Sequence, residues 1–338
     1  MRQVNDLTLS VVVPTHNRPE RLGRLLAELD RIGQKGPPFE LVVGVDGPND
    51  DTHAMLAALR TTYPLRVVTS ARRGASAARN AAIAAASGDI LLFLDDDVVP
   101  DDGLLERHLA VHRSDPLAAV VGRMAAPPDR ALPVWLDWEA KLLDRRYSRL
   151  VEGRIPLSWR DFFTANASVR REHAMAVGGF DERFLRVQDI EFAHRLAIHG
   201  LRFHFLSDAV IHHDPDKTLE TWVRLAFERG RYHLMLEQQR GLDGQLYLQE
   251  DWRRRHVLSR MLARWCVGHA ARTRLVVGAL RRGITSPLVT SRRIRLLLCS
   301  AVFNVKYWDG VAVATGLGTS LWRGFIDAPA TGVAPRPG

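Results

Sequence analysis

Four short apolar runs in the first hundred residues constrain the fold most strongly, because a helix-like segment separates each run from the next. The runs cover residues 9–13, 39–45, 65–69 and 90–94. Helical periodicity between them is clearest where Leu22, Leu25, Leu26 and Leu29 repeat. This alternation predicts a parallel sheet with helices on both faces. Ligands of such sheets bind beyond the carboxyl ends of the strands. We therefore look for the functional site among the residues that follow the four runs.

Three consecutive carboxylates, Asp95, Asp96 and Asp97, come directly after the fourth run. Adjacent ionised carboxylates repel and raise each other's pKa. We expect a bound cation to hold them, and a hard divalent ion with oxygen ligands is the usual candidate. Capping of the next helix is the alternative, but Asp101 and Asp102 are expected to fill that role. If the cation also holds a diphosphate, the protein is an enzyme that handles nucleotide derivatives.

The regular alternation ends near residue 125. Beyond it the sequence predicts helices at 135–147 and 189–199, strands at 162–169 and 201–206, and a strand-like stretch at 209–211. From Thr218 onward the pattern is helical and increasingly basic. We therefore predict three parts: a first half at 1–125, a second half at 126–215 and a helical extension at 216–338.

A series of motifs in a fixed order resembles the family 2 glycosyltransferases. The motifs cover residues 10–18, 45–52, 74–80, 88–97, 164–171, 178–184 and 188–191, and the whole match runs from about Leu9 to about Arg231. The resemblance implies the α/β fold of the nucleotide-diphosphosugar transferases, called GT-A. This fold has a mixed, mostly parallel sheet flanked by helices, and here a basic helical C-terminal extension follows it. The first half would bind the nucleotide-sugar and the second half the acceptor.

The resemblance assigns the nucleotide-sugar contacts to a few residues. The family recognises the nucleobase with the second acid of a pair, and this chain has Val45 followed by Asp46. Asp46 would therefore accept a hydrogen bond from a base, with Pro14 and Thr15 alongside it. A simple turn at Asp46 is the alternative. Arg79 would lie near the phosphates, or else on a solvated helix face.

The acid triplet matches the metal-binding acids of the family. Asp97 is predicted as the direct ligand of Mn²⁺ or Mg²⁺, and Asp95 or Asp96 would reach the ribose. The cation would bridge the diphosphate and neutralise the leaving group. His213 matches a position where related enzymes often place a further metal ligand, and the adjacent His212 is the alternative.

Asp189 is the predicted catalytic base. Sugar transfer with inversion needs one carboxylate to take the proton of the attacking acceptor hydroxyl. The family usually has Glu-Asp here, and this chain has Gln188 before Asp189. An N-cap for the following helix is the alternative role for Asp189. Glu191 precedes Arg195 by four residues, so a helix-face ion pair explains it.

Three tryptophans are candidates for stacking on an acceptor ring, namely Trp135, Trp138 and Trp159. Trp135 and Trp138 are three residues apart, so burial of one helix face explains this pair equally and is the preferred interpretation.

The charge of the chain is divided unevenly. The net charge is +9, but residues 252–308 hold twelve Arg, one Lys and no Asp or Glu, so this segment carries +13 and the remainder −4. Interleaved Arg, Leu, Val and Trp suit an anionic membrane surface. Nucleic acid is an unlikely partner, since the segment has no recognised binding motif. A solvated helical bundle is the remaining alternative.

Other features of the sequence bear on localisation. No secretory signal peptide is recognisable, and no run of about 20 apolar residues is present. Two cysteines, Cys266 and Cys299, form neither a disulfide framework nor a zinc site. We expect a cytoplasmic protein, peripheral on the inner face of the membrane if the basic segment binds lipid.

The sequence thus predicts a metal-dependent, inverting glycosyltransferase that moves a sugar from a nucleotide-diphosphate donor to a hydroxyl of a saccharide, glycolipid or small molecule. The absent acids at Val45 and Gln188 leave open a catalytically impaired nucleotide-sugar-binding protein. A sugar-phosphate nucleotidylyltransferase would need a Gly-rich loop near the N-terminus, and residues 10–18 contain no glycine.

Overall fold

The computed structural model describes residues 7–47, 50–71, 74–240 and 245–315. The chain folds into two compact units, and each is described by itself. The first combines Met1–Leu132 with Glu139–Asp216, and the second combines Pro133–Trp138 with Lys217–Gly338. Both predicted halves, 1–125 and 126–215, fall within the first unit except for residues 133–138. Pro48 and Asn49, in the motif at 45–52, lie outside the described residues.

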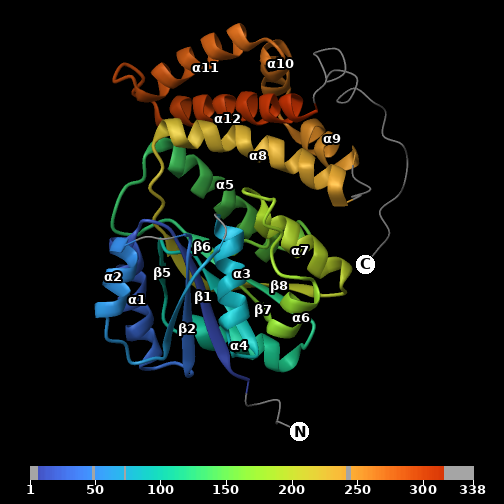
Figure 1. Ribbon diagram of the computed structural model, residues 1–338. Helices are drawn as coiled ribbons and strands as arrows, with labels where there is room; N and C mark the ends of the chain where they lie inside the picture. Colours follow the sequence, from blue (N-terminus) through green and yellow to red (C-terminus); the bar gives the residue numbers. More distant parts are fainter. Residues whose placement is uncertain (1–6, 48–49, 72–73, 241–244, 316–338) are drawn as a thin grey trace. The chain divides into compact units, whose positions relative to one another are not determined.

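The first unit is built on one mixed sheet of eight strands, whose order is β3-β2-β1-β4-β7-β6-β8-β5 (Figure 1). The strands are β1 (Leu9–Thr15), β2 (Phe39–Val45), β3 (Leu65–Thr69), β4 (Ile90–Leu94), β5 (Val98–Pro100), β6 (Ala118–Ala125), β7 (Asn166–Arg170) and β8 (Arg202–His213). Strands β1 to β4 are mutually parallel, as is the pair β6–β8. Strand β7 runs antiparallel to β4 and β6, and β5 runs antiparallel to β8. The predicted mixed, mostly parallel α/β sheet is confirmed.

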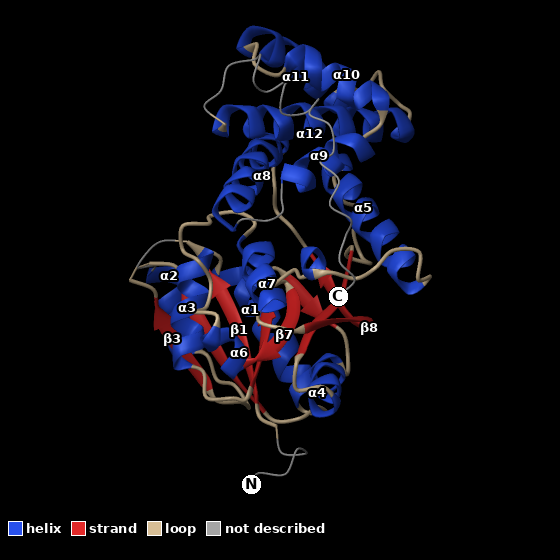
Figure 2. Cartoon of the chain, turned by 90° about the vertical axis from the view of Figure 1, so that its right-hand side faces the viewer, coloured by secondary structure: helices blue, strands red, loops and turns tan. Residues whose placement is uncertain are grey.

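Helices cover both faces of this sheet (Figure 2). They are α1 (Pro19–Gly33), α2 (Asp50–Ala58), α3 (Ala75–Ala85), α4 (Leu104–Ser114), α6 (Arg171–Ala176) and α7 (Gln188–Ile198), together with most of α5 (Val134–Val151). Alternate residues of a strand point to opposite faces. Val11 and Val13 accordingly pack in the core that contains residues of α1, α2 and α4. Val12 packs in the core that contains residues of α3, α6 and α7.

Three of the four predicted strands have the predicted bounds, and β1 continues two residues further to Thr15. The strand-like stretches at 201–206 and 209–211 form one strand, β8, because β6 pairs with both parts across an irregularity at Gly122 and Arg123. The capping prediction for Asp101 and Asp102 is wrong. Helix α4 begins after Gly103, whose left-handed conformation (φ 78°) starts the helix without a side-chain cap.

Glycine at position 44 sets the distance between β2 and α3. A Cβ atom there would lie 2.1 Å from the carbonyl oxygen of Ala78. Because real Cβ atoms do not approach backbone so closely, only glycine allows α3 to pack against this strand. The contact fixes the helix that carries Arg79 and Asn80 relative to the sheet.

A buried polar chain connects α4 with β7. The Asn166 amide donates to the carbonyl oxygens of Arg123 and Ala209, so its Oδ1 accepts from His108 Nε2 at 3.0 Å. Neutral His108 then uses Nδ1 to accept from the Ser168 hydroxyl, whose oxygen accepts from His112 Nε2; both distances are 2.8 Å. Burial lowers the pKa of His108 to about 4 and that of His112 to about 3. The motif residues Asn166 and Ser168 therefore have a structural role here.

The second unit is helical. It contains α8 (Leu219–Arg240), α9 (Gln245–Arg254), α10 (Val257–Cys266), α11 (Ala270–Thr285), α12 (Arg292–Ala314) and the first turn of α5. Helix α12 packs against α8, α10 and α11. Cβ atoms at Gly230 and Gly310 would each lie 2.0 Å from a carbonyl oxygen of the facing helix, so glycine permits the close contact of α8 and α12. Both cysteines are buried and free.

Helix α12 qualifies the expectation that no apolar run is long enough to span a bilayer. Among the described residues it is the one helix that meets the length and composition of a membrane span, with a mean hydropathy of 1.3. More than half of that stretch, 56%, is buried inside the structure. Core helices of soluble proteins meet the same test, and the buried face of α12, which includes Val302, Val305 and Trp308, accounts for its apolar composition.

Candidate active site

The acid triplet lies at the topological switch point of the sheet. Strands β1 and β4 are neighbours, but the chain continues from β1 toward β2 and β3 and returns on the other side to form β4. Ligands of open α/β sheets bind at the carboxyl ends of such a strand pair. Thr15 ends β1 and Asp95 follows β4, and the Thr15 hydroxyl donates to Asp96 Oδ2 at 2.8 Å. The predicted convergence of these two strand ends is therefore observed.

Asp96 is the most enclosed of the three acids and is only 4% exposed. Burial raises its pKa and Asp97 adds to the increase, whereas Arg18 opposes it. Arg18 Nη1 donates to Asp96 Oδ1 at 3.0 Å. Burial alone would lower the pKa of Arg18, but the charges of Asp96 and Asp97 outweigh it and the pKa is raised. Arg18 thus favours the charged form of Asp96, but burial and Asp97 outweigh it, so the pKa of Asp96 stays above its ordinary value.

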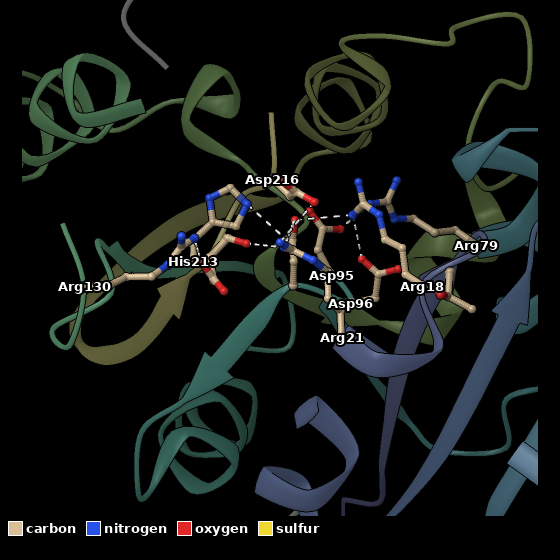
Figure 3. A network of polar contacts seen from close by, with 11 residues as sticks. Arg18, Arg21, Arg79, Asp95, Asp96, Arg130, His213 and Asp216 are labelled. Atoms are coloured by element: carbon tan, nitrogen blue, oxygen red, sulfur yellow. Dashed lines mark hydrogen bonds and ion pairs between the residues drawn. The ribbon is translucent and has the colours of Figure 1, made fainter. Parts of the chain in front are cut away.

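Asp97 lies between basic groups on two sides, namely His213 on one and Arg18 and Arg21 on the other, and Figure 3 labels these three basic residues. Its Oδ1 is 3.3 Å from His213 Nε2. Its Oδ2 is 3.4 Å from Arg18 Nη1 and 4.0 Å from Arg21 Nη1. The Asp97 side chain is 9% exposed. In such a cluster the carboxylate can bind a cation, and the guanidinium groups can bind a diphosphate.

The side chains of His212 and His213 point to opposite faces of the sheet, because the two residues occupy successive positions of β8. His213 pairs with Val98 and faces Asp97. His212 contacts the carbonyl oxygen of Ala126 and Asp101 Oδ1 instead, each at 3.1 Å. Of the two, the structure brings only His213 to the acid triplet.

Arg79 is 3% exposed, so the interpretation as a solvated helix face is wrong. Its Nη2 donates to Asp95 Oδ1 at 2.7 Å, and its guanidinium lies 5.5 Å from the centre of the Phe180 ring. The Nε and Nη1 atoms are buried without a hydrogen-bond partner. Buried unpaired donors are costly, so they are typical of a site that receives an acceptor group from a ligand.

The neighbouring Asn80 connects two motifs that are a hundred residues apart. Its Oδ1 accepts from the backbone N–H of Phe180 at 2.7 Å, and its Nδ2 donates to the carbonyl oxygen of Phe180 at 2.8 Å. A Cβ atom at Gly179 would lie 2.6 Å from Asn80 Oδ1, which explains the glycine in this loop. An open hollow of about 710 Å³ is lined by Asn80, Phe180 and other residues of α3 and the 178–183 loop.

Asp46 connects the loop after β2 with the residue that precedes α3. Its backbone N–H donates to the carbonyl oxygen of Thr15, and its Oδ1 accepts from the Gly74 N–H at 2.8 Å. His16 Nδ1 contacts the Asp46 carbonyl oxygen at 2.9 Å. Val45 is fully buried in the core. The side chain at position 45 thus belongs to the hydrophobic core of the sheet.

Asp189 occupies the first turn of α7, where its Oδ1 accepts from the Ile190 N–H at 2.9 Å. The N-cap residue is Val187, so the N-cap interpretation of Asp189 is wrong. Val187 has φ +54°, and Asn17, before α1, has φ +53°. They are the two non-glycine residues of positive φ in the described part of the chain. Such strain concentrates at functional sites, and these residues precede the helices that carry Asp189 and Arg21.

Several other predicted residues have structural roles. Glu191 is fully buried and forms a bidentate ion pair with Arg195, which confirms the helix-face interpretation. Trp138 is buried in the second unit against Trp222 and Phe303. In the same unit Trp135 Nε1 donates to the Lys217 carbonyl oxygen. Trp159, in the first unit, packs edge-on against His194.

Sequence reasoning missed Arg18 and Arg21. Arg18 ends the first motif and is the N-cap residue of α1, and Arg21 lies three residues further, in the first turn of that helix. Arg21 Nη2 is also 3.5 Å from Asp216, and its Nη1 donates to the carbonyl oxygen of Asp214. The signal was present as two arginines at helical spacing directly after a strand end.

The described residues include no group of three or more His, Cys, Asp or Glu side chains that could hold a metal ion. Asp97 and His213 nevertheless face each other at 3.3 Å. A carboxylate and an imidazole are a donor pair that a divalent transition metal accepts, and diphosphate oxygens and water commonly complete such a site. The donor set of this chain therefore fits a cation that binds together with a diphosphate.

Comparison with solved structures identifies the fold. A structure of the mannosyltransferase PcManGT from Pyrobaculum calidifontis, in complex with GDP-Man and Mn²⁺, aligns with a TM-score of 0.61 and 19% identity, covering 90% of this chain and 87% of that one. S. aureus TarS 1-349 in complex with UDP aligns with a TM-score of 0.52 and 16% identity, covering 92% of each chain. The first unit thus has the GT-A fold of the nucleotide-diphosphosugar transferases.

The sequence itself matches the family described as Glycosyl transferase family 2 over residues 10–178, which is half of the chain. The protein belongs to this family. Asp189 lies beyond the matched segment.

Two curated relatives extend the comparison. The uncharacterized glycosyltransferase YfnE of Bacillus subtilis is 28% identical over 60% of this chain and 64% of its own length. The validoxylamine A glucosyltransferase of Streptomyces hygroscopicus subsp. limoneus is 29% identical over 57% of this chain and 48% of its own length. The matches therefore span less than two thirds of the length of these relatives.

Proposed function

We propose that the protein is a metal-dependent, inverting glycosyltransferase that moves a sugar from a nucleotide-diphosphate donor to an acceptor hydroxyl. The observation that carries this proposal is the cluster at the β1–β4 switch point, where Asp97 faces His213 on one side and Arg18 and Arg21 on the other. The cluster combines groups for a cation with groups for an anion, which a metal-bound diphosphate needs.

The donor would bind along the carboxyl ends of β1, β2 and β4. Asp46, Pro14 and Thr15 would lie at the nucleobase, and Asp95 and Asp96 at the ribose. Arg79 would offer its two buried, unpartnered nitrogens to a phosphate oxygen. UDP- and GDP-sugars are the first donors to test, since solved neighbours of the same fold are complexes with UDP and with GDP-Man.

Asp97 and His213 would hold the cation. We favour Mn²⁺ over Mg²⁺, because an imidazole is a poorer ligand for the harder ion. When bound, the cation would neutralise charge on the departing diphosphate. Arg18 and Arg21 would orient the Asp97 carboxylate, and their guanidinium groups would contact the diphosphate.

Asp189 would act as the general base. It would take the proton of the acceptor hydroxyl while the hydroxyl oxygen forms a bond to the anomeric carbon of the sugar. The bond from the anomeric carbon to the diphosphate breaks in the same step, and the nucleoside diphosphate leaves with the bonding electrons. The strained Val187 before this helix supports a functional position for Asp189.

The acceptor would be a saccharide, a glycolipid or a small molecule. The concentration of positive charge at residues 252–308 supports a contact with an anionic membrane surface, and nucleic acid would not be the partner. The protein would then work in the cytoplasm, peripheral to the inner face of the membrane.

Release of nucleoside diphosphate from a panel of UDP- and GDP-sugars, with and without Mn²⁺, tests the proposal. We expect Mn²⁺-stimulated release from one donor, and faster release when the correct acceptor is added. Binding of a donor without any release or transfer would instead indicate a catalytically impaired nucleotide-sugar-binding protein. Absence of both binding and release would refute the proposal.

A further inference from the structure

The outer surface of α10 is a stripe of apolar side chains. Val257, Leu258, Met261 and Trp265 are 51%, 66%, 62% and 49% exposed. Their spacing places all four within about one third of the helix circumference. The opposite side of α10 is buried through Ala263 and Cys266. Helix α10 thus carries apolar side chains on two sides. One side packs against the rest of the unit and the other faces outward.

Positive charge borders this stripe. The guanidinium of Arg272, on the neighbouring α11, lies 5.5 Å from the centre of the Trp265 ring. Arg274 and Arg282 are exposed on the same helix, beside Leu275, which is 73% exposed. The described part of the chain provides no carboxylate partner for these arginines, and residues 252–308 contain no Asp or Glu.

The combination of exposed apolar side chains and arginines distinguishes between the possible binding partners of this surface. A nucleic acid would neutralise the arginines but would gain little from four outward apolar side chains. A purely apolar protein surface would bury the stripe but leave the cations unpaired. An anionic bilayer satisfies both, because its headgroups pair with arginine and its acyl region receives Trp, Met and Leu.

We propose that α10 and α11 form a monotopic membrane anchor, in which Leu258, Met261 and Trp265 insert at the headgroup–acyl boundary while Arg272, Arg274 and Arg282 bind anionic lipid headgroups. This inference deepens the membrane contact proposed above and rests on that part of the proposed function alone. It requires insertion of α10 as well as electrostatic attraction, and it assigns no spanning role to α12.

Co-flotation of the full-length protein with lipid vesicles tests the anchor. The vesicles are phosphatidylcholine with or without phosphatidylglycerol, at physiological salt. We expect co-flotation with the anionic vesicles only. The double variant Met261→Ser/Trp265→Ser should weaken the affinity about tenfold per side chain removed. The variant Arg272→Glu/Arg282→Glu should abolish binding, because it reverses the local charge.

Matched controls come from the first unit. Ile198→Ser removes a side chain that is 72% exposed, and Arg60→Glu reverses an exposed charge. Both should bind vesicles like the wild type. Equal loss in the controls, or unchanged binding of Met261→Ser/Trp265→Ser, would overturn the anchor. A wild type that ignores vesicles but binds a duplex oligonucleotide at the same salt, or that dimerises through this stripe, would overturn it as well.

Binding of UDP and GDP to the same preparations separates this inference from the proposed transferase chemistry. Vesicle binding without nucleotide binding would leave the anchor intact and count against the donor site. Nucleotide binding without vesicle binding would do the reverse.

Discussion

The edge of the sheet and the C-terminal helices use arginine in opposite ways. At the edge, Arg18 lies within 3.4 Å of both Asp96 and Asp97, and Arg79 contacts Asp95 at 2.7 Å. On α11, Arg272 and Arg282 have no carboxylate partner in the described part of the chain. The edge is preorganised by charges that the chain itself balances, whereas the helical unit carries charge that a partner has to balance.

This difference separates the energetic roles of the two regions. A balanced cluster contributes to the stability of the free protein, and its removal should affect stability and donor binding together. An unbalanced patch contributes little to folding, and its removal should affect only the encounter with the partner. Each prediction below tests one side of this contrast.

Asp97→Asn should have the largest effect. The substitution keeps the size of the side chain but removes the charge between His213 and Arg18. We expect a loss of transfer on the order of a thousandfold. Vesicle binding should be unchanged, because the C-terminal helices are intact. Asp102→Asn, at an exposed acid that pairs with Arg31, is the matched control and should retain activity. Near-normal transfer by Asp97→Asn would contradict the assignment.

Asp189→Asn should reduce the rate of sugar transfer and leave the binding of the nucleoside diphosphate nearly unchanged. The amide cannot accept the proton of the acceptor hydroxyl, so transfer should fall by about a hundredfold or more. Affinity for the nucleoside diphosphate should remain within a few-fold of the wild type, since Asp189 has no assigned donor contact. Transfer rates and calorimetric affinities of the same sample provide the two readouts. Equal losses in both would remove Asp189 from the role of base.

Arg18→Ala and Arg282→Ala compare a balanced arginine with an unbalanced one. Without Arg18, the buried Asp96 loses its guanidinium partner and still repels Asp97, so we expect a loss of about 1–2 kcal/mol in the free energy of unfolding. Mn²⁺ should restore part of this loss, because a bound cation replaces the missing charge. Arg282→Ala should leave stability unchanged in urea unfolding with and without Mn²⁺. Similar free energies of unfolding for the two variants would contradict the different roles assigned to Arg18 and Arg282.

The buried histidines predict an effect on stability in the first unit that appears only at acidic pH. The pKa values of His108 and His112 in the folded state, about 4 and about 3, lie below the ordinary value of 6.5. Well above pH 6.5 both histidines are neutral in the folded and in the unfolded chain, so their contribution to stability is fully present. Below pH 6.5 the unfolded chain takes up protons that the folded chain does not, so stability falls with falling pH, by about 5 kcal/mol for the two histidines together between pH 7.5 and 4.5.

His112→Gln isolates this contribution, because the Gln amide can still donate to the Ser168 oxygen but does not titrate. Urea unfolding at the two pH values should show a smaller decrease for the variant than for the wild type. An equal decrease would show that other groups cause the acid sensitivity.

Local patterns predicted the carboxyl edge of strands β1 to β4 well. The bounds of β2, β3 and β4, and the placement of Thr15 next to Asp96, follow from apolar runs and from the rule that parallel strand ends meet at one edge. The motif resemblance indicated Asp97 and His213. Pairing geometry then distinguished His213 from His212, because successive residues of a strand face opposite sides.

What sequence reasoning could not supply depends on long-range packing. The salt bridges of Arg18 with Asp96 and Asp97 join residues almost eighty positions apart. The burial of Arg79 depends on Phe180 and its loop, a hundred residues away. The outward stripe of α10 could not be distinguished from its buried side, because both are apolar and only the neighbouring helices define the inside.

The central claim is that the acids at the β1–β4 edge form a metal-dependent diphosphate site, and calorimetric titration of UDP and GDP tests it most directly. The account predicts that wild-type protein binds one of the two nucleotides at least about tenfold more tightly with Mn²⁺ than without it, and that Asp97→Asn loses this Mn²⁺ dependence. Nucleotide binding that is indifferent to Mn²⁺ in the wild type, or that keeps its Mn²⁺ dependence in Asp97→Asn, would contradict the account.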